Sequence, residues 1–122
     1  MRAILVEDEL IMQRSFRRIS AEIEDFELLA MFDNADDALR FVELNEVDAA
    51  FIDIYLPNVN GFQLAAMIRL AKPQLKLVFV SASEAFSRDY DGFGAVDFLL
   101  KPYSRERLKE VIKKIQSDSH RP

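Results

Sequence analysis

The sequence predicts an α/β fold in which a parallel β-sheet is covered by helices on both faces. Short, continuous apolar runs alternate with segments in which apolar residues recur at helical spacing. Strands that are apolar on both sides are typical of a sheet buried between two helical layers, and the alternation indicates parallel strands joined by crossovers. The chain has 122 residues, half of them hydrophobic, which suits one compact domain.

The chain begins with a strand, a helix and a second strand. The apolar run at residues 2–6 (RAILV) predicts the first strand, and residues 26–32 (FELLAMF) predict the second. Between them, four apolar residues recur at steps of four, three and four and predict one helix face: Met12, Phe16, Ile19 and Ile23.

Two further strand–helix units occupy the middle of the chain. Asn34 is placed to cap a helix over residues 35–44, whose first turn carries acidic side chains that suit the positive helix start. The apolar run at residues 47–54 predicts a third strand that is buried on both faces but contains one carboxylate, Asp53. A helix that starts after Gly61 follows.

The last part of the chain has one weak region. Residues 75–82 predict the fourth strand and residues 95–100 the fifth, in which Asp97 is interpreted as the mark of a more exposed face. Between them, residues 84–90 predict only a short helix. Ser104 is placed to cap a final helix. The inward stripe of that helix has four members: Leu108, Val111, Ile112 and Ile115.

Together these patterns predict a doubly wound (βα)5 flavodoxin-like sandwich. Right-handed crossovers place helices on both faces of the sheet. By analogy with other doubly wound sheets of this size, we expect a parallel five-stranded sheet in the order 2-1-3-4-5. Ligands of such sheets bind beyond the carboxyl ends of the strands, so polar residues there are the first candidates for a functional site.

Composition excludes several classes of protein. The chain has no cysteine, which rules out disulfides and thiolate metal sites, and its apolar runs are too short to span a bilayer. The N-terminus does not resemble a secretory signal, so we expect a cytoplasmic protein without membrane contact. A net charge of −5 argues against direct nucleic-acid binding by this segment, and its basic clusters are interpreted as solvated helix faces.

Polar residues stand at the ends of the central strands. Asp53 is the most unusual of them, because a carboxylate in an apolar strand costs free energy unless it is paired, hydrated or bound to a metal. The first strand ends in residues 7–9 (EDE), the fourth in Ser81, and the fifth in Lys101 and Pro102. The fold would gather these carboxylates, the hydroxyl and the ammonium at one edge of the sheet.

The chemistry of this set indicates a hard cation and a phosphoryl group. Crowded carboxylates repel one another, so either one takes up a proton or a cation joins them, and oxygen ligands favour Mg²⁺. A cation and an ammonium neutralise phosphoryl oxygens during in-line transfer, and a carboxylate beside them can form an aspartyl phosphate. Each residue alone has a plainer explanation, such as a helix cap or a solvated lysine, but their joint occurrence favours a site.

At these positions the chain resembles the receiver domain of bacterial two-component response regulators. The resemblance runs nearly end to end, through ILVEDE (4–9), DIYLPNVNG (53–61), VSAS (80–83) and VDFLLKP (96–102). It implies that Asp53 accepts a phosphoryl group from a sensor histidine kinase or phosphotransfer protein, and that Asp53 also contacts Mg²⁺.

The resemblance also implies roles for the neighbouring residues. Asp8 would bind Mg²⁺ directly, Glu7 would bind it through water, and the main-chain carbonyl of Tyr55 would be a further ligand. Lys101 would pair with the phosphoryl oxygens and precede a cis bond to Pro102. Glu7 stands where aspartate is commoner in the family.

Two residues are implied to carry the switch. Ser81, where threonine is commoner, would donate its hydroxyl to the phosphoryl group and draw its loop inward. Phe98 stands at the switch aromatic position, although ordinary strand core explains it as well. We expect the face formed by residues 83–94, the fifth strand and the final helix to change shape and pair with a partner, such as a second copy of the chain.

Other interpretations stay open at this point. A Mg²⁺-dependent aspartyl-phosphate phosphatase would share the nucleophile and the metal, but Tyr55 stands where its second acid or base is usual. We therefore expect no enzyme beyond catalysis of the domain's own phosphorylation and dephosphorylation. A receiver-like interaction module that is not controlled by phosphorylation would not need the intact site, and a flavin-binding sheet would not suit an acidic edge.

The expected domain organisation is simple. Residues 1–117 would form the receiver domain, and residues 118–122 a C-terminal tail or the start of a linker. Residues 98–108 (FLLKPYSRERL) also resemble receivers joined to a LytTR-type DNA-binding domain, which this segment could not itself contain.

Overall fold

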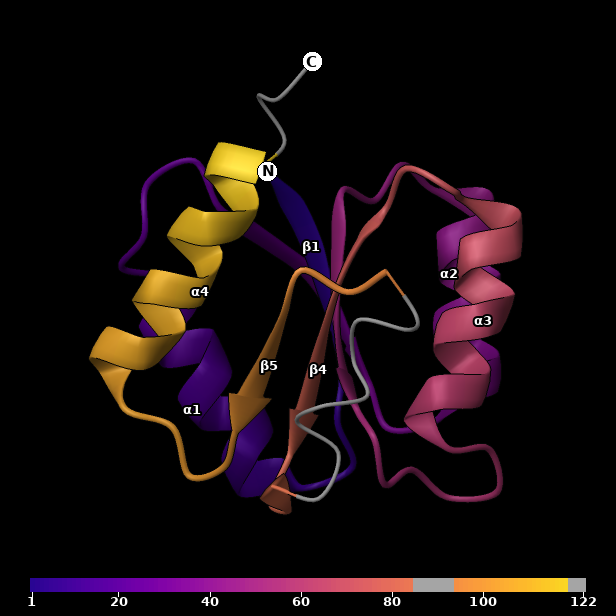
Figure 1. The fold of residues 1–122 in the computed structure, drawn as a ribbon, viewed down its shortest axis with the longest axis horizontal. Helices are drawn as coiled ribbons and strands as arrows, with labels where there is room; N and C mark the ends of the chain where they lie inside the picture. Colours follow the sequence, from indigo (N-terminus) through magenta and orange to yellow (C-terminus); the bar gives the residue numbers. More distant parts are fainter. Residues whose placement is uncertain (85–93, 119–122) are drawn as a thin grey trace.

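The structure is a computed structural model that describes residues 1–84 and 94–118. Within that part of the chain, a parallel five-stranded sheet in the order β2-β1-β3-β4-β5 lies between two layers of helices (Figure 1). The strands are β1 (Arg2–Val6), β2 (Glu27–Phe32), β3 (Ala49–Asp53), β4 (Lys76–Ser81) and β5 (Asp97–Leu100). The helices are α1 (Leu10–Ser20), α2 (Ala35–Leu44), α3 (Gly61–Ala71) and α4 (Arg105–Asp118). The predicted fold class and strand order are confirmed.

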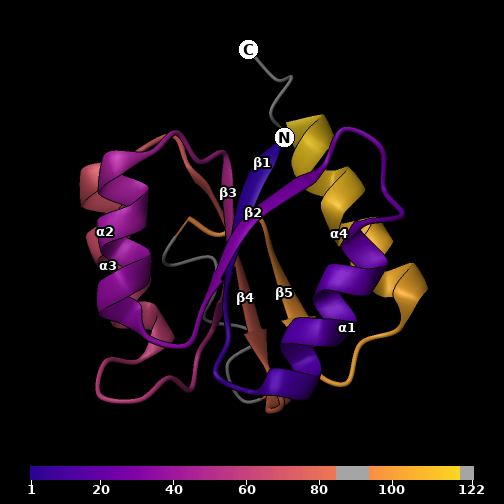
Figure 2. The same ribbon diagram turned by 180° about the vertical axis from the view of Figure 1, so that it is seen from behind.

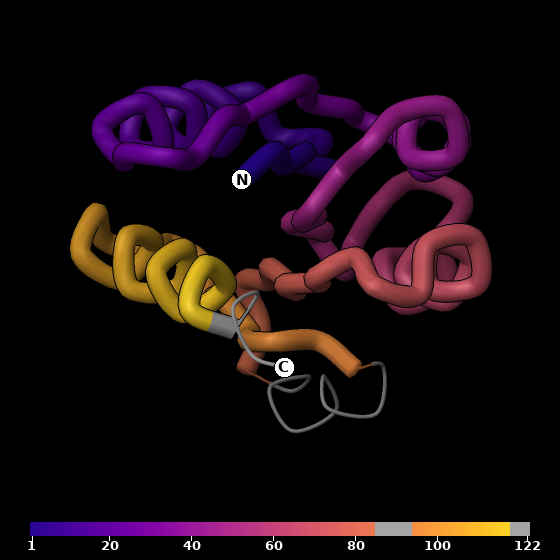
Figure 3. Tube along the Cα trace, turned by 90° about the horizontal axis from the view of Figure 1, so that it is seen from above, coloured from indigo at the N-terminus to yellow at the C-terminus, as the bar shows by residue number. Residues whose placement is uncertain are grey.

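Each face of the sheet is covered by a pair of helices. Helices α1 and α4 lie side by side on one face and α2 and α3 on the other, as the view from behind and the view from above both show (Figures 2 and 3). Phe51 of β3 packs with Phe16 and Ile112 on the first face, whereas Ile52 packs with Leu64 on the second. Every residue of β3 is buried, as expected for a central strand with helices on both sides.

Side-chain caps fix the starts of two predicted helices. Asn34 Oδ1 accepts a hydrogen bond of 2.9 Å from the Asp37 N–H, and α2 covers the predicted residues. Ser104 Oγ accepts one of 3.0 Å from the Arg107 N–H at the start of α4. Both caps satisfy backbone donors that have no partner inside the helix.

Two expected boundaries differ from the structure or lie outside it. Helix α1 ends at Ser20, so Ile23 packs against the same core from the following connection rather than from the helix. The short helix expected at residues 84–90 falls almost entirely on residues 85–93, outside the described part. In the described residues, no helix is long and apolar enough to cross a membrane.

The interpretation of Asp97 as the mark of an exposed face is wrong. Only 8% of Asp97 is exposed. Its Oδ1 lies 3.1 Å from Arg107 Nη2 and accepts a 2.7 Å hydrogen bond from the Phe98 N–H, while Oδ2 lies 3.6 Å from Lys114 Nζ. Two cations of α4 therefore compensate the buried charge, which holds this helix against β5.

The turn after β3 requires glycine at position 61. A Cβ on Gly61 would lie 2.7 Å from the Cα of Ile54 and closer still to the carbonyl oxygen of Asp53. The Gly61 N–H donates a 2.7 Å hydrogen bond to the Ile54 carbonyl oxygen. The start of α3 therefore packs directly against the end of the strand that carries Asp53.

Candidate functional site

The predicted site residues meet at the carboxyl edge of the sheet, toward which the arrowheads of β4 and β5 point in Figure 1. The register aligns Val6 with Ile52, Asp53 with Val80 and Ser81 with Leu100. Polar residues that end or directly follow these strands must consequently lie close together, although Glu7 and Lys101, the most distant in sequence, are 94 positions apart.

Asp53 is held through both carboxylate oxygens. It is the last residue of β3 and is 3% exposed. Oδ2 lies 2.7 Å from Lys101 Nζ, and Oδ1 accepts a 2.9 Å hydrogen bond from the Tyr55 N–H. The ion pair and the backbone donor offset the cost of burying this charge, which explains how a carboxylate is tolerated in an apolar strand.

Lys101 is the centre of the charge arrangement. Its Nζ lies 2.7 Å from Glu7 Oε1, 2.7 Å from Asp53 Oδ2 and 2.9 Å from Glu9 Oε1. Burial acts to lower the pKa of Lys101, but hydrogen bonds to Asp53, Glu7 and Glu9 outweigh it and hold the pKa above its usual value. The residue is therefore a fixed cation beside Asp53.

Glu7 is nearly inaccessible, with 1% of its surface exposed. Burial raises the pKa of Glu7 to about 7, the nearby Asp53 adds to the rise, and Lys101 opposes it. Glu7 Oε2 accepts a 3.2 Å hydrogen bond from the Glu9 N–H. The carboxyl group is thus poised between its neutral and charged forms near neutral pH.

A metal ion would find oxygen ligands at this edge. Glu7, Asp8, Glu9 and Asp53 each offer one carboxylate oxygen, and these atoms lie within 4.8 Å of one another. Asp8 is exposed, whereas Glu7 and Asp53 are buried. An all-oxygen set of this charge suits a hard divalent cation such as Mg²⁺.

Glu9 is the member of the cluster to which sequence reasoning gave no role. The signal that the sequence offers is its position directly after Glu7 and Asp8, in the acidic segment that follows the first strand. Its contact with Lys101 spans 92 positions and depends on the neighbouring ends of distant strands, which no local pattern reports.

Ser81 and Phe98 lie on the neighbouring strands. Ser81 is fully buried, its Oγ accepts a 3.1 Å hydrogen bond from the Ser83 N–H, and its carbonyl oxygen accepts one of 2.8 Å from the Lys101 N–H. Phe98 is 7% exposed and belongs to the core on the α2–α3 face. The bond between Lys101 and Pro102 is cis, as the family resemblance implies. The switching roles of Ser81 and Phe98 remain predictions.

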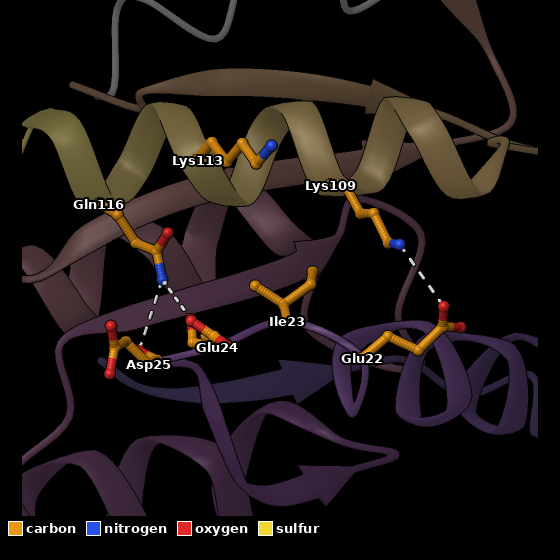
Figure 4. Close-up of a pocket in the computed structure, with 7 residues that line it drawn as sticks. All are labelled: Glu22, Ile23, Glu24, Asp25, Lys109, Lys113 and Gln116. Atoms are coloured by element: carbon orange, nitrogen blue, oxygen red, sulfur yellow. Dashed lines mark hydrogen bonds and ion pairs between the residues drawn. The ribbon is translucent and has the colours of Figure 1, made fainter.

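A separate hollow, drawn in Figure 4, lies between α4 and the connection from α1 to β2. Its lining comes from Glu22, Ile23, Glu24 and Asp25 of the connection and from Lys109, Lys113 and Gln116 of α4. Gln116 donates to the main-chain oxygens of Glu24 and Asp25, and Lys109 pairs with Glu22 at 3.4 Å. These contacts fasten α4 to the connection, and none of the predicted site residues lines this hollow.

The comparisons with known proteins agree with the geometry. Residues 3–113 match the response regulator receiver domain. The transcriptional regulatory protein YpdB of Escherichia coli K12 is 32% identical over 117 residues, which cover 96% of this chain and 48% of that protein. The transcriptional regulatory protein LytR of Staphylococcus aureus N315 is 26% identical with the same coverage. The chain thus spans about half the length of the curated relatives it matches.

Solved structures show the same similarity. The response regulatory domain of MrkE from Klebsiella pneumoniae has a TM-score of 0.89 and 30% identity, with 97% of both chains covered. The response regulator TrrA from Thermotoga maritima, in complex with Mg²⁺ and BeF, has a TM-score of 0.83 and 25% identity, with 93% of this chain and 97% of TrrA covered. The chain belongs to the response regulator receiver domain family, the phosphoacceptor module of two-component signal transduction.

Proposed function

We propose that Asp53 is the phosphoacceptor of this receiver domain, and that the donor is the phosphohistidine of a sensor kinase or phosphotransfer protein. The observation that carries the proposal is the pairing of the buried Asp53 carboxylate with Lys101, 2.7 Å away, inside an acidic cluster at the sheet edge. A buried carboxylate with a fixed cation beside it is suited to receive a group that arrives with negative charge.

The reaction follows from these positions. An Asp53 carboxylate oxygen attacks phosphorus, the phosphorus–nitrogen bond of the donor breaks, and its electron pair stays on the imidazole. The product is an acyl phosphate on Asp53. Lys101 is close enough to neutralise charge on the phosphoryl oxygens, and Ser81 at the end of the adjacent β4 would donate its hydroxyl to one of them.

We propose Mg²⁺ as the cation, held by Asp8 and Asp53, with Glu7 through water and the main-chain carbonyl of Tyr55 as a further ligand. The all-oxygen cluster supports this choice, and so does the relative TrrA, which forms a complex with Mg²⁺ and BeF. When bound, the ion neutralises charge on the transferring group.

Phosphorylation would act through the neighbouring strands. A phosphoryl group adds negative charge and strong acceptors beside Lys101 and Ser81, whose main chains are joined by a 2.8 Å hydrogen bond. We propose that this shifts the face formed by β5 and α4, with Phe98 changing position as part of the switch. The face would then pair with a second copy of the chain or with an output partner.

A small phosphodonor tests the acceptor role. With acetyl phosphate and Mg²⁺, intact-mass measurement should show one added phosphoryl group in the native sequence and none in Asp53→Asn. The control is Asp33→Asn, because Asp33 is an exposed carboxylate that follows β2 at the same edge and bonds Asn34. Labelling that survives in Asp53→Asn would contradict the proposal.

The same samples separate the alternatives. Repeated hydrolysis of phosphate esters would favour a phosphatase, whereas we expect only slow loss of the phosphoryl group from Asp53 itself. Light scattering with and without beryllofluoride and Mg²⁺ reports association. An unchanged particle mass together with an unchanged NMR spectrum of β5 and α4 would contradict the proposed switch and favour a module not controlled by phosphorylation.

A further inference from the structure

Glu9 is a solvent-exposed residue beside the acidic edge of the sheet. It directly precedes α1, and its side chain is 60% exposed. Even so, its Oε1 lies 2.9 Å from Lys101 Nζ and forms a hydrogen bond with it. Of the carboxylates that surround Lys101, it is the one whose charged end remains in contact with solvent.

The surroundings of Lys101 leave little room for another acceptor. An ammonium group has three N–H donors and no acceptor. Oxygens of Glu7, Glu9 and Asp53 all lie within 2.9 Å of Nζ. For phosphoryl oxygens to bind Lys101, at least one of these contacts must be given up.

The contacts differ in what their loss costs. Asp53 carries the phosphoryl group after transfer, so its own contact with Lys101 changes with the reaction. Of the other two contacts, the one to Glu7 is buried, because Glu7 is 1% exposed, and its loss would leave a buried carboxyl group without its partner. Water can replace Lys101 at the exposed Glu9 carboxylate, so this contact costs least to break. The Glu9 side chain can leave Lys101 while its main chain stays in place, because the main-chain N–H is held by a 3.2 Å hydrogen bond to Glu7 Oε2.

We infer that Glu9 is a positioning residue that holds Lys101 in the unphosphorylated state and exchanges with the phosphoryl group. The inference rests on the proposed acceptor role of Asp53. A contact made only in the unphosphorylated state lowers the affinity for a phosphoryl group, and the Glu9 charge also repels that group. Glu9 therefore sets the balance between the two states without being required for the reaction.

Beryllofluoride affinity measures this balance. We compare the native sequence, Glu9→Gln and the charge-matched control Asp33→Asn by calorimetric titration with beryllofluoride at saturating Mg²⁺. Glu9→Gln should bind about threefold to tenfold more tightly, the range expected when an exposed ion pair and a like-charge repulsion are both removed. Asp33→Asn changes the net charge equally, but the Asp33 carboxylate bonds Asn34, so this variant should bind like the native sequence.

Titration with Mg²⁺ alone separates this role from metal binding. Its half-saturation in Glu9→Gln should change less than the beryllofluoride affinity does. Weaker Mg²⁺ binding with weaker beryllofluoride binding would make Glu9 a metal ligand and overturn the inference, as would an unchanged beryllofluoride affinity. If the native sequence itself fails to bind beryllofluoride, the proposed function fails as well, so the two failures are distinguishable.

Discussion

At the scale of single residues, Glu7 couples the acidic edge to the stability of the fold. Its pKa in the folded protein is about 7, raised mainly by burial, against an ordinary value near 4.5. Between these two values the folded chain binds the proton more tightly than the unfolded chain does. The contribution of Glu7 to stability is therefore fully present below about pH 4.5 and is lost as the pH rises toward about 7.

Glu7→Gln should remove this pH dependence. We expect its free energy of unfolding to exceed that of the native sequence by on the order of 1–2 kcal/mol near pH 8 in EDTA, and to match it near pH 5. Gln keeps an acceptor for Lys101 but carries no charge to repel Asp53. Urea unfolding across this range, with equal slopes in denaturant, measures the difference. Parallel pH profiles for the two proteins would show that folding does not raise the pKa of Glu7.

Residue identities at the sheet edge could be predicted because they break a pattern. Asp53 stands within an apolar run, Ser81 ends another, and Glu7 and Lys101 directly follow two more. Alternation and parallel topology were therefore enough to place them at one edge of the sheet. Glu9 was missed because its role depends on which side chain it reaches rather than on which strand it follows. That distinction is made by tertiary packing alone.

At the scale of elements, the junction of β3 and α3 positions the acceptor. Gly61→Ala would place a methyl group against the main chain at Asp53 and Ile54, which cannot yield as a side chain can. We expect a loss of about 1–3 kcal/mol in stability, typical of overpacking, and slower phosphorylation of Asp53 because the end of β3 is displaced. Urea unfolding and the rate of labelling by acetyl phosphate test both effects.

The control for Gly61→Ala is a second substitution in α3, away from the β3 junction. Ala66 is exposed on α3, so Ala66→Gly should cost about 1 kcal/mol through helix propensity and leave the labelling rate of the folded protein unchanged. Equal effects of the two substitutions on labelling would mean that the stability of α3, and not the contact at Asp53, controls the site.

Element boundaries were predictable where a local signal exists. Asn34 and Ser104 mark helix starts because their side chains bond the backbone a few residues on, and the apolar runs define the strands. Asp97 was misread because its partners, Arg107 and Lys114, come from a later helix. A charge within a strand is informative only when the cations that pack against it are known.

At the scale of the whole molecule, the site exists only when the fold is complete. Glu7 and Asp8 follow β1, and Asp53 ends β3. These two strands are neighbours in the sheet although α1, β2 and α2 lie between them in sequence. The order could be expected only by analogy, because the periodicity of single elements does not specify which strands pair. The unfolded chain holds these carboxylates apart, so a cation bound by all of them binds the folded state alone.

Folding and Mg²⁺ binding should consequently be linked. A ligand that binds only the folded state stabilises it by RT ln(1 + [L]/Kd), or about 1.4 kcal/mol at a concentration tenfold above Kd. We expect Mg²⁺ to raise the free energy of unfolding by this amount, which shifts the urea midpoint by that energy divided by the slope in denaturant. NaCl of equal ionic strength should have little effect. Asp8→Asn should lose most of the stabilisation by Mg²⁺, and it should still fold because Asp8 is exposed. Asp33→Asn should retain the stabilisation by Mg²⁺. A Mg²⁺ effect that persists in Asp8→Asn would mean that the ion acts elsewhere or through general screening, because a site assembled from β1 and β3 cannot lose its most accessible ligand without losing affinity.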